Sequence, residues 1–339
     1  MMSTGISIKN HKPIILFLLC ALLIFSIFVS ILFGSVSIRL SEIFQILTSK
    51  NNNTTAYTLI TAVRIPRVLG GLFAGIGLSC AGVILQGVMN NSLASPNTIG
   101  VNSGSGFAVM LALMLFPTNP CFMPLFAFSG ALITTLFVFL LAYLTDSSRT
   151  TIVLAGITIS SFFNAGINTL KLLDTEISIN LTSFMIGSLS GLTMSRLILP
   201  CICILTAFCL SFILAKSLNI LSLGDDIARS LGMQVPLTRF IFLMLASVMA
   251  GCVVSYAGLL SFIGLIVPHI CRQLFGNDAR FLLPCSALLG GSFALLCDLL
   301  GRILFAPFEL PAGILMAFIG GPFFLYLLLK RKGGRRINA

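Results

Sequence analysis

Charged residues are scarce in this chain of 339 residues, and their scarcity excludes most soluble architectures. Lys, Arg, Asp and Glu together make up 9% of the residues, whereas 57% are hydrophobic. A soluble domain carries about 25% charged residues, so most of this surface must face lipid or neighbouring helices. The net charge of +11 comes from basic residues scattered between apolar runs, which argues against a nucleic-acid partner. We therefore predict an all-α polytopic membrane protein.

The residue patterns of several enzyme and cofactor sites are also missing. None of the seven lysines follows a glycine, so the chain has no Walker A motif and cannot bind ATP by that route. The two histidines are not accompanied by a cluster of carboxylates, and the ten cysteines contain no C-x-x-C pair. Cysteine in apolar runs usually packs as a small hydrophobic residue. We predict no catalytic residue, no metal site and no cofactor bound by this chain, so ATP would be used by a partner subunit.

Long apolar runs are what the chain has instead. A membrane crossing needs about 20 apolar residues, or fewer where protein shelters the helix. Ten runs meet this condition, and we predict one transmembrane domain over residues 1–339. The predicted crossings are 14–34, 63–86, 98–116, 121–144, 152–172, 196–215, 239–257, 259–271, 281–303 and 312–329.

The distribution of basic residues predicts the orientation in the membrane. An even number of crossings places both termini on one side. If that side is the cytoplasm, it holds thirteen of the twenty Lys and Arg residues, as the positive-inside rule requires. The basic tail at 330–339 would then meet an anionic lipid leaflet. We predict a multi-pass protein of the cytoplasmic membrane with both termini cytoplasmic.

A short polar segment at 224–232, inside a loop at about 217–238, interrupts the apolar pattern. Asp225 and Asp226 stand where a helix begins, and helix dipoles favour negative charge there. Asp225 and Arg229 are spaced to pair across one turn, and Gly232 can end the helix. The predicted orientation places this helix in the cytoplasm, where it would dock a soluble partner.

Three arginines lie on the opposite side of the predicted membrane. Arg64 and Arg67 share a helix face at the start of the second crossing, and Arg302 follows Asp298 by one turn at the end of the ninth. Two interpretations stay open. The arginines extend to the interface, with an Asp298–Arg302 ion pair, or they form an outward basic rim that receives an acidic partner.

Small and polar residues indicate where helices pack and where a pathway lies. The pairs Gly71/Gly75, Gly100/Gly104 and Gly187/Gly191 have the spacing that brings helices close in lipid. The polar residues at membrane depth either satisfy one another and the irregular backbone around Pro96, or line a path. The candidate pathway or gate residues are Gln86, Asn91, Pro96, Asn102, Arg149 and Thr150.

Four sequence blocks resemble one known family: Arg64-Ile65-Pro66-Arg67 with Asn91-Ser92-Leu93-Ala94-Ser95-Pro96, then Gly224-Asp225-Asp226-x-Ala228-Arg229-x-Leu231-Gly232, then Gly258 to Arg272, then Glu309-Leu310-Pro311-Ala312-Gly313 through Phe324. The blocks are similar to those of permease subunits of ATP-binding-cassette (ABC) importers for iron–siderophore complexes, haem and vitamin B12, the type II importers. The resemblance covers nearly the whole chain.

This resemblance implies ten crossings per subunit, a homodimer or close heterodimer with the pathway between its subunits, two cytoplasmic ATPase subunits and an external substrate-binding protein. Arg64, Arg67 and Arg302 match the positions where the family's basic residues meet acidic residues of the binding protein. The residues that match the family's ATPase-coupling loop are Gly224, Asp225, Asp226, Ala228, Arg229, Leu231 and Gly232.

The chain departs from the family pattern in two places. Asn91-Ser92-Leu93 replaces the usual Asn-Pro-Leu, and the chain has no tryptophan upstream of Gly187. We expect an importer permease that moves an iron–siderophore complex, or a haem or cobalamin complex, by alternating access. The alternative is an ion-coupled secondary transporter, which would need titratable groups within the membrane, and only Asp298 and Glu309 are near candidates.

Overall fold

The computed structural model describes residues 12–34, 55–119, 121–145, 148–173 and 175–335, and this part of the chain is helical throughout, with turns between the helices. Each predicted crossing corresponds to one helix. These are α1 (Lys12–Leu32), α4 (Ile65–Val88), α5 (Val101–Leu115), α6 (Phe122–Leu144), α7 (Arg149–Leu173), α9 (Met194–Ile213), α12 (Val235–Ala257), α13 (Ile263–Phe275), α14 (Ala279–Ile303) and α15 (Ala312–Arg335). The side chains of the predicted basic tail at 330–339 lie outside the described residues.

Seven of these helices are long and apolar enough to cross a membrane, and α5, α13 and α15 are shorter apolar helices. Six short elements complete the described chain and lie at the ends of the crossings. They are α3 (Thr55–Thr58), the π-helix η2 (Leu59–Arg64), the 3₁₀ helix η3 (Pro96–Ile99), α8 (Thr175–Ile186), α10 (Ala215–Ser222) and α11 (Asp225–Ser230).

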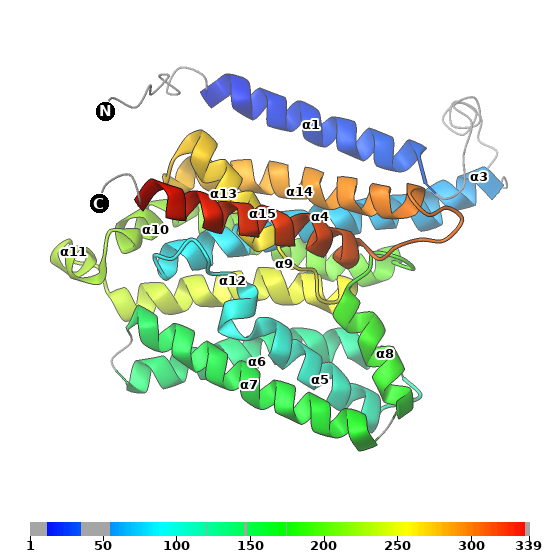
Figure 1. The fold of residues 1–339 in the computed structure, drawn as a ribbon, viewed down its shortest axis with the longest axis horizontal. Helices are drawn as coiled ribbons and strands as arrows, with labels where there is room; N and C mark the ends of the chain where they lie inside the picture. Colours follow the sequence, from blue (N-terminus) through cyan, green and yellow to red (C-terminus); the bar gives the residue numbers. More distant parts are fainter. Residues whose placement is uncertain (1–11, 35–54, 120, 146–147, 174, 336–339) are drawn as a thin grey trace.

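The long helices run along one axis of the molecule (Figure 1). We name its two ends after the short helices there: α11 projects from the α11 end, and α8 and α3 lie at the opposite, α8 end. Helix α1 begins and α15 finishes at the α11 end, as an even number of crossings requires. The predicted loop at 217–238 lies at the α11 end and contains most of α10 together with α11.

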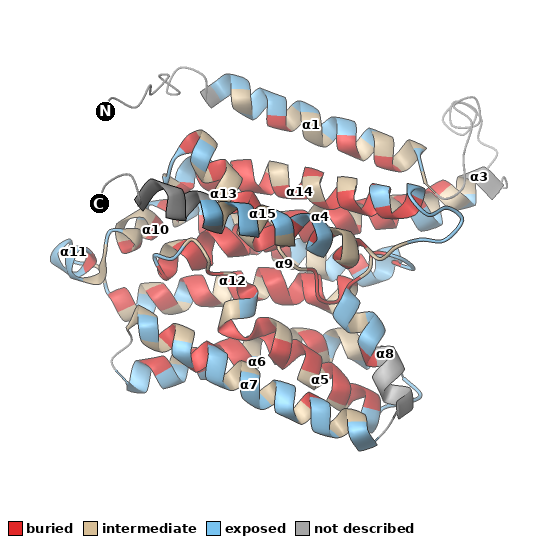
Figure 2. Cartoon of the chain, viewed as in Figure 1, coloured by how far each residue is buried: buried red, intermediate tan, exposed pale blue. Residues whose placement is uncertain are grey.

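Helix α4 lies at the centre of the bundle, where α14, α12 and α13 pack against it. Its residues are mostly buried, whereas α1 and α7 present largely exposed residues (Figure 2). The exposed side chains of α1 are apolar: Phe17 is 72% and Ile24 68% accessible. Such a surface suits hydrocarbon, in which apolar side chains carry no penalty for exposure.

Glycines bring the central helices into backbone contact. A Cβ atom added to Gly75 would overlap the backbone of Gly290 in α14, and one added to Gly82 would overlap the carbonyl group of Gly264 in α13. Gly104 makes the same kind of approach between α5 and α6. The close packing predicted for Gly75 and Gly104 is therefore confirmed, since small residues let helices approach in lipid, where the hydrophobic effect supplies no attraction between them.

The packing prediction for Gly187 and Gly191 is wrong. Both lie in the non-helical segment between α8 and α9, with φ angles of 76° and 70°. This left-handed backbone favours glycine, so the two residues form turns. Gly187 still lies close to the carbonyl group of Leu259, whereas a Cβ atom at Gly191 would have no neighbour within 4 Å.

We predict that Gly82→Ala lowers the thermal stability of the purified protein, because the added methyl group meets the rigid backbone of α13. Overpacking of this kind costs about 1–3 kcal/mol. Gly321→Ala is the matched control, since a Cβ atom there has no neighbour within 4 Å. Melting temperatures measured in detergent should fall for Gly82→Ala alone. Equal melting temperatures for the two variants would contradict close α4–α13 packing.

Candidate functional site

Helix α11 forms as its sequence predicts. Asp225 and Asp226 occupy its first turn and Arg229 its last, which matches the helix dipole. Gly232 has a φ of 79°. Its N–H donates to the carbonyl of Arg229 at 2.9 Å, and the Met233 N–H donates to that of Ala228 at 3.0 Å. This is the Schellman pattern, which satisfies carbonyls at a helix end.

The carboxylate of Asp225 joins α11 to two crossing helices. Nη2 of Arg239 donates to both of its oxygens at 2.8 and 2.7 Å, and Nη2 of Arg149 lies 3.1 Å from Oδ1. The Arg149 Nη2 also donates to the carbonyl of Leu221 at 2.8 Å. Because Arg149 begins α7 and Arg239 lies in the first turns of α12, one carboxylate links three helices.

The predicted one-turn pairing of Asp225 with Arg229 is wrong. Arg149 and Arg239 occupy the carboxylate instead, and Arg239 is only 1% exposed. Burial makes an unpaired guanidinium costly, whereas an exposed arginine keeps its hydration. Arg229 is exposed, and it is in none of the ion pairs among the described residues.

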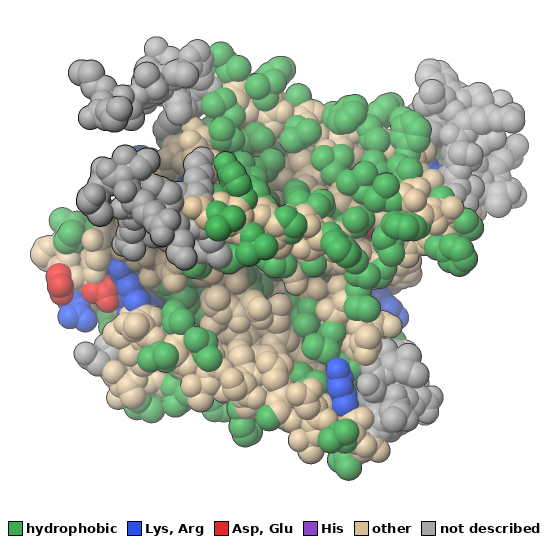
Figure 3. Space-filling view, viewed as in Figure 1, with side chains coloured by type: hydrophobic (Ala, Val, Ile, Leu, Met, Phe, Trp, Pro, Cys, Tyr) green, Lys and Arg blue, Asp and Glu red, His purple; other side chains and the backbone are tan. Residues whose placement is uncertain are grey.

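Three exposed apolar side chains lie on α11 or directly beside it in the chain. Ile227 is in α11, Leu231 follows its last residue and Leu223 precedes it, and they are 49%, 61% and 60% exposed. Asp226 and Arg229 are exposed beside them. Figure 3 shows acidic and basic side chains gathered at this end of a molecule whose visible surface is otherwise largely uncharged. The helix therefore presents a small apolar face with charges beside it.

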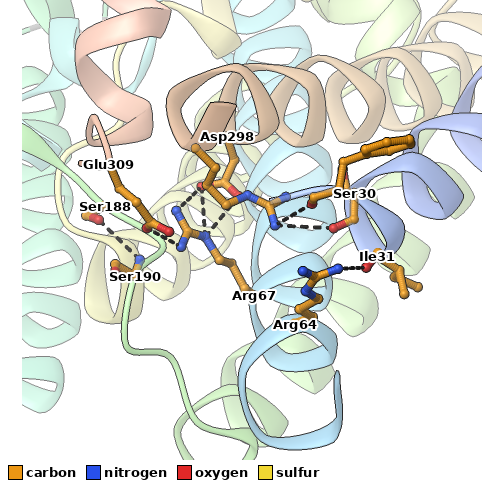
Figure 4. Close-up of polar contacts among 10 residues, drawn as sticks. Ser30, Ile31, Arg64, Arg67, Ser188, Ser190, Asp298 and Glu309 are labelled. Atoms are coloured by element: carbon orange, nitrogen blue, oxygen red, sulfur yellow. Dashed lines mark hydrogen bonds and ion pairs between the residues drawn. The ribbon is translucent and has the colours of Figure 1, made fainter. Parts of the chain in front are cut away.

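The three arginines at the α8 end lie inside the protein. Arg64, Arg67 and Arg302 are 4%, 6% and 3% exposed. Arg67 donates from Nε and Nη2 to Asp298 at 3.0–3.1 Å and from Nη1 to Glu309 at 2.6 Å (Figure 4). We refer to these three arginines with Asp298 and Glu309 as the arginine cluster.

The arginine cluster also fixes the end of α1. Nη1 of Arg302 donates to the carbonyls of Ser30 and Phe33 at 3.2 and 3.3 Å, and Nη1 of Arg64 donates to those of Ile31 and Leu32. The last carbonyls of a helix have no partner within it, and cations stabilise that end. The arginines thus attach α1 to the bundle.

These contacts bear on the two interpretations of the three arginines, an Asp298–Arg302 ion pair and an outward basic rim. The Asp298–Arg302 ion pair is confirmed, with Nε of Arg302 3.1 Å from Oδ2 of Asp298. The three guanidinium groups are buried in the described structure and do not form an exposed rim; that they receive an acidic partner stays a prediction. Of the two carboxylates, Asp298 is 3% exposed at its side chain and Glu309 is 28% exposed.

The candidate pathway residues fall in three separate places. Gln86 and Asn91 line a cavity of about 440 Å³ at the α11 end, where Gln86 accepts a hydrogen bond from Arg272. Asn102 lines a cavity of about 410 Å³ between α5 and α7. Arg149 belongs to the Asp225 network.

The other two candidates, Pro96 and Thr150, lie at the starts of helices. Pro96 is buried and begins η3, and Thr150 is exposed at the start of α7. The irregular backbone predicted around Pro96 is therefore present, as the 3₁₀ helix η3.

Several polar residues of these places were missed by the sequence analysis. Arg239 was included only in the count of thirteen basic residues on the cytoplasmic side, and Arg272 only there and as the last residue of the third sequence block. The wall of the second cavity also includes Ser160, Ser161 and Asn164 of α7. Their spacing of three and four residues, which places Ser160 and Ser161 on the same side of the helix as Asn164, was the signal that could have located them.

Comparison with known proteins assigns the chain to a family. Residues 22–330 match the FecCD transport family. The chain is 39% identical over 272 residues to the Fe(3+)-citrate import system permease protein YfmE of Bacillus subtilis, which covers 80% of this chain and 81% of the relative. It is 33% identical over 302 residues to the hemin transport system permease protein HmuU of Yersinia pestis, covering 87% and 90%.

A solved structure supports the same assignment at the level of the fold. It shows an inward-facing conformation of a metal-chelate type ABC transporter, with a TM-score of 0.84 and 31% identity over 94% of this chain and 99% of the other. The chain therefore belongs to the FecCD transport family and is a multi-pass permease subunit of an ABC importer.

Proposed function

We propose that this permease imports an iron chelate of the siderophore, ferric citrate or haem class, and that two cytoplasmic ATPase subunits drive it through α11. The chain binds neither ATP nor a metal cofactor of its own. Relatives named for Fe(3+)-citrate and hemin import support the cargo class. The positive-inside distribution of charge supports a cytoplasmic α11 end with both termini there.

The observation that carries this proposal is the exposed face of α11. The exposed side chains of Leu223, Ile227 and Leu231, on and next to a helix that Asp225 holds to the crossings, are suited to a groove in a partner protein. Asp226 and Arg229 are exposed among them and can set the orientation of docking by charge complementarity. The partner is the ATPase subunit, because the chain has no nucleotide-binding motif.

Asp225 provides the route by which movement of α11 reaches the crossings. Its bonds to Arg149 and Arg239 connect the base of α11 to the first turns of α7 and α12. When ATP binding draws the ATPase subunits together, α11 and these two helices move as one body. The result is alternating access, a rigid-body change at an interface between subunits.

The pathway runs along α5 and α7, against a second permease copy. It includes the cavity of about 410 Å³, whose described lining residues carry amides and hydroxyls such as those of Asn102, Ser160 and Asn164 but no charged group. Such a wall holds a hydrated chelate loosely and discriminates little by charge. Selectivity then rests with an external binding protein that docks at the α8 end.

An ion-coupled transporter is the less favoured mechanism. It would require a carboxylate within the membrane that binds and releases a proton or cation during transport. Asp298, the buried candidate, is shared between Arg67 and Arg302. Both of its oxygens are held by guanidinium groups within the protein, which suits a structural role.

We predict that Arg229→Glu lowers ATP-driven uptake at least about tenfold while membrane insertion is unchanged, since a reversed charge facing a partner costs several kcal/mol. Uptake and ATP hydrolysis are measured in proteoliposomes with the ATPase subunits. The control is Arg196→Glu, an exposed arginine at the α8 end. If both variants transport at the native rate, α11 does not dock the ATPase as proposed.

Asp225→Asn should retain ATPase binding but lose most uptake, because the neutral amide no longer holds Arg149 and Arg239 together. Lost hydrogen bonds to charged groups cost about 1.5–3 kcal/mol each. Asp226→Asn is the comparison for docking, since Asp226 is adjacent, exposed and in none of the ion pairs of the described residues; its uptake should fall only as far as its ATPase binding falls. Uptake by Asp225→Asn that is native, or that falls only in proportion to ATPase binding, would refute transmission through Asp225.

A further inference from the structure

The two carboxylates that bind Arg67 are held in different ways. Asp298 belongs to α14, is almost fully buried and is shared with Arg302. Glu309 lies in the non-helical segment between α14 and α15, is 28% exposed at its side chain, and accepts a hydrogen bond from Nη1 of Arg67 at 2.6 Å. Asp298 is therefore buried between two arginines, whereas Glu309 is the partly exposed carboxylate on Arg67.

Glu309 and Arg67 line a cavity of about 320 Å³ that reaches the protein surface. Its other polar side chains are the hydroxyls of Ser183, Ser188 and Ser190, of which Ser183 and Ser190 are exposed. In Figure 4, Glu309 approaches Arg67 from the side of Ser188 and Ser190. A negatively charged group entering here meets one guanidinium and several hydroxyl donors, and among the described residues of the lining Glu309 is the carboxylate in its way.

We propose that Glu309 is an internal substitute for an acidic side chain of the substrate-binding protein, and that docking exchanges one carboxylate for the other on Arg67. This inference rests on the proposed function, because it requires an external binding protein at the α8 end. Nη1 of Arg67 cannot give its short bond to two carboxylates at once, and two carboxylates at one site repel each other. The incoming side chain therefore displaces Glu309.

The charge of the arginine cluster favours this exchange. Three arginines and two carboxylates leave one positive charge in excess. Loss of Glu309 from Arg67 raises the excess to two, and a carboxylate from the partner restores the original balance. While Glu309 is bound, it pairs the guanidinium of Arg67, which would otherwise be desolvated and only partly paired when the binding protein is absent.

Backbone bonds connect Glu309 to the segment that forms the far wall of the cavity. The N–H of Leu310 donates to the carbonyl of Gly301 at 2.9 Å, and the N–H of Gly313 donates to that of Gly187 at 3.2 Å. Displacement of Glu309 thus acts on a chain segment that is bonded next to Ser188. Docking and the position of this segment are coupled through Glu309.

The first experiment needs no partner and tests whether Glu309 keeps other anions away from Arg67. In a Ser190→Cys background, labelling by an anionic and by a cationic methanethiosulfonate reagent is followed at position 190 by mass spectrometry, because Cys121 and Cys209 are also exposed. Glu309→Gln should raise the ratio of anionic to cationic labelling rates several-fold, and Arg67→Gln should lower it. An unchanged ratio in Glu309→Gln overturns the proposal.

The second experiment measures the affinity of the binding protein from the same transport system for the assembled transporter in nanodiscs. Glu309→Gln should bind it on the order of tenfold more tightly. This factor is expected if Glu309 is released from Arg67 in about a tenth of the native protein. Glu309→Asp, with a shorter reach and the same charge, should fall between, and serves if the glutamine variant does not fold. Native or weaker affinity in both variants overturns the exchange.

Arg67→Gln distinguishes docking at the arginine cluster from the exchange of Glu309. If it weakens binding while the Glu309 variants change nothing, the binding protein docks at the arginine cluster and the exchange is wrong. If Arg67→Gln leaves affinity unchanged, docking at the cluster is itself wrong, and the exchange is refuted with it, whatever the labelling ratio shows.

Discussion

The cost of an unpaired charge in hydrocarbon governs where this chain can carry function. A charged side chain at the centre of a bilayer costs about 2.5–3.5 kcal/mol on insertion scales. The described part of the chain meets this constraint in the same way at both ends, by sharing one aspartate between two arginines. Asp225 lies between Arg149 and Arg239, and Asp298 between Arg67 and Arg302. The helices between these ends pack through apolar side chains and glycines.

A shared carboxylate is also a joint between helices. At the α11 end it connects α11 with α7 and α12, and at the α8 end the arginine cluster connects α4 with α14 and α1. The glycine contacts of α4 with α13 and α14 leave these helices no room to slide. We infer that the transport movement lies on the side of α5 and α7, where the polar cavity of about 410 Å³ is found.

Much of the fold could be predicted from the sequence, because lipid makes each crossing a long apolar run. The end of α11 at Gly232 could be predicted as well, because glycine readily adopts the left-handed conformation that ends a helix. The partners of Asp225 did not, since Arg149 is 76 residues away in the chain and only the tertiary packing brings the two together. The burial of Arg67 was missed because hydropathy alone does not reveal that Asp298 and Glu309 converge on it. The site roles remain predictions.

The distance between α11 and the start of α7 tests the account most directly. Spin labels at the exposed positions Ser230 and Thr150 would report this distance by pulsed electron paramagnetic resonance in the assembled transporter. The account predicts one narrow distance that is the same without nucleotide and with ATP trapped, while the distance between the two Thr150 positions of the permease pair changes. A change of several ångströms between α11 and α7 on ATP binding would contradict it.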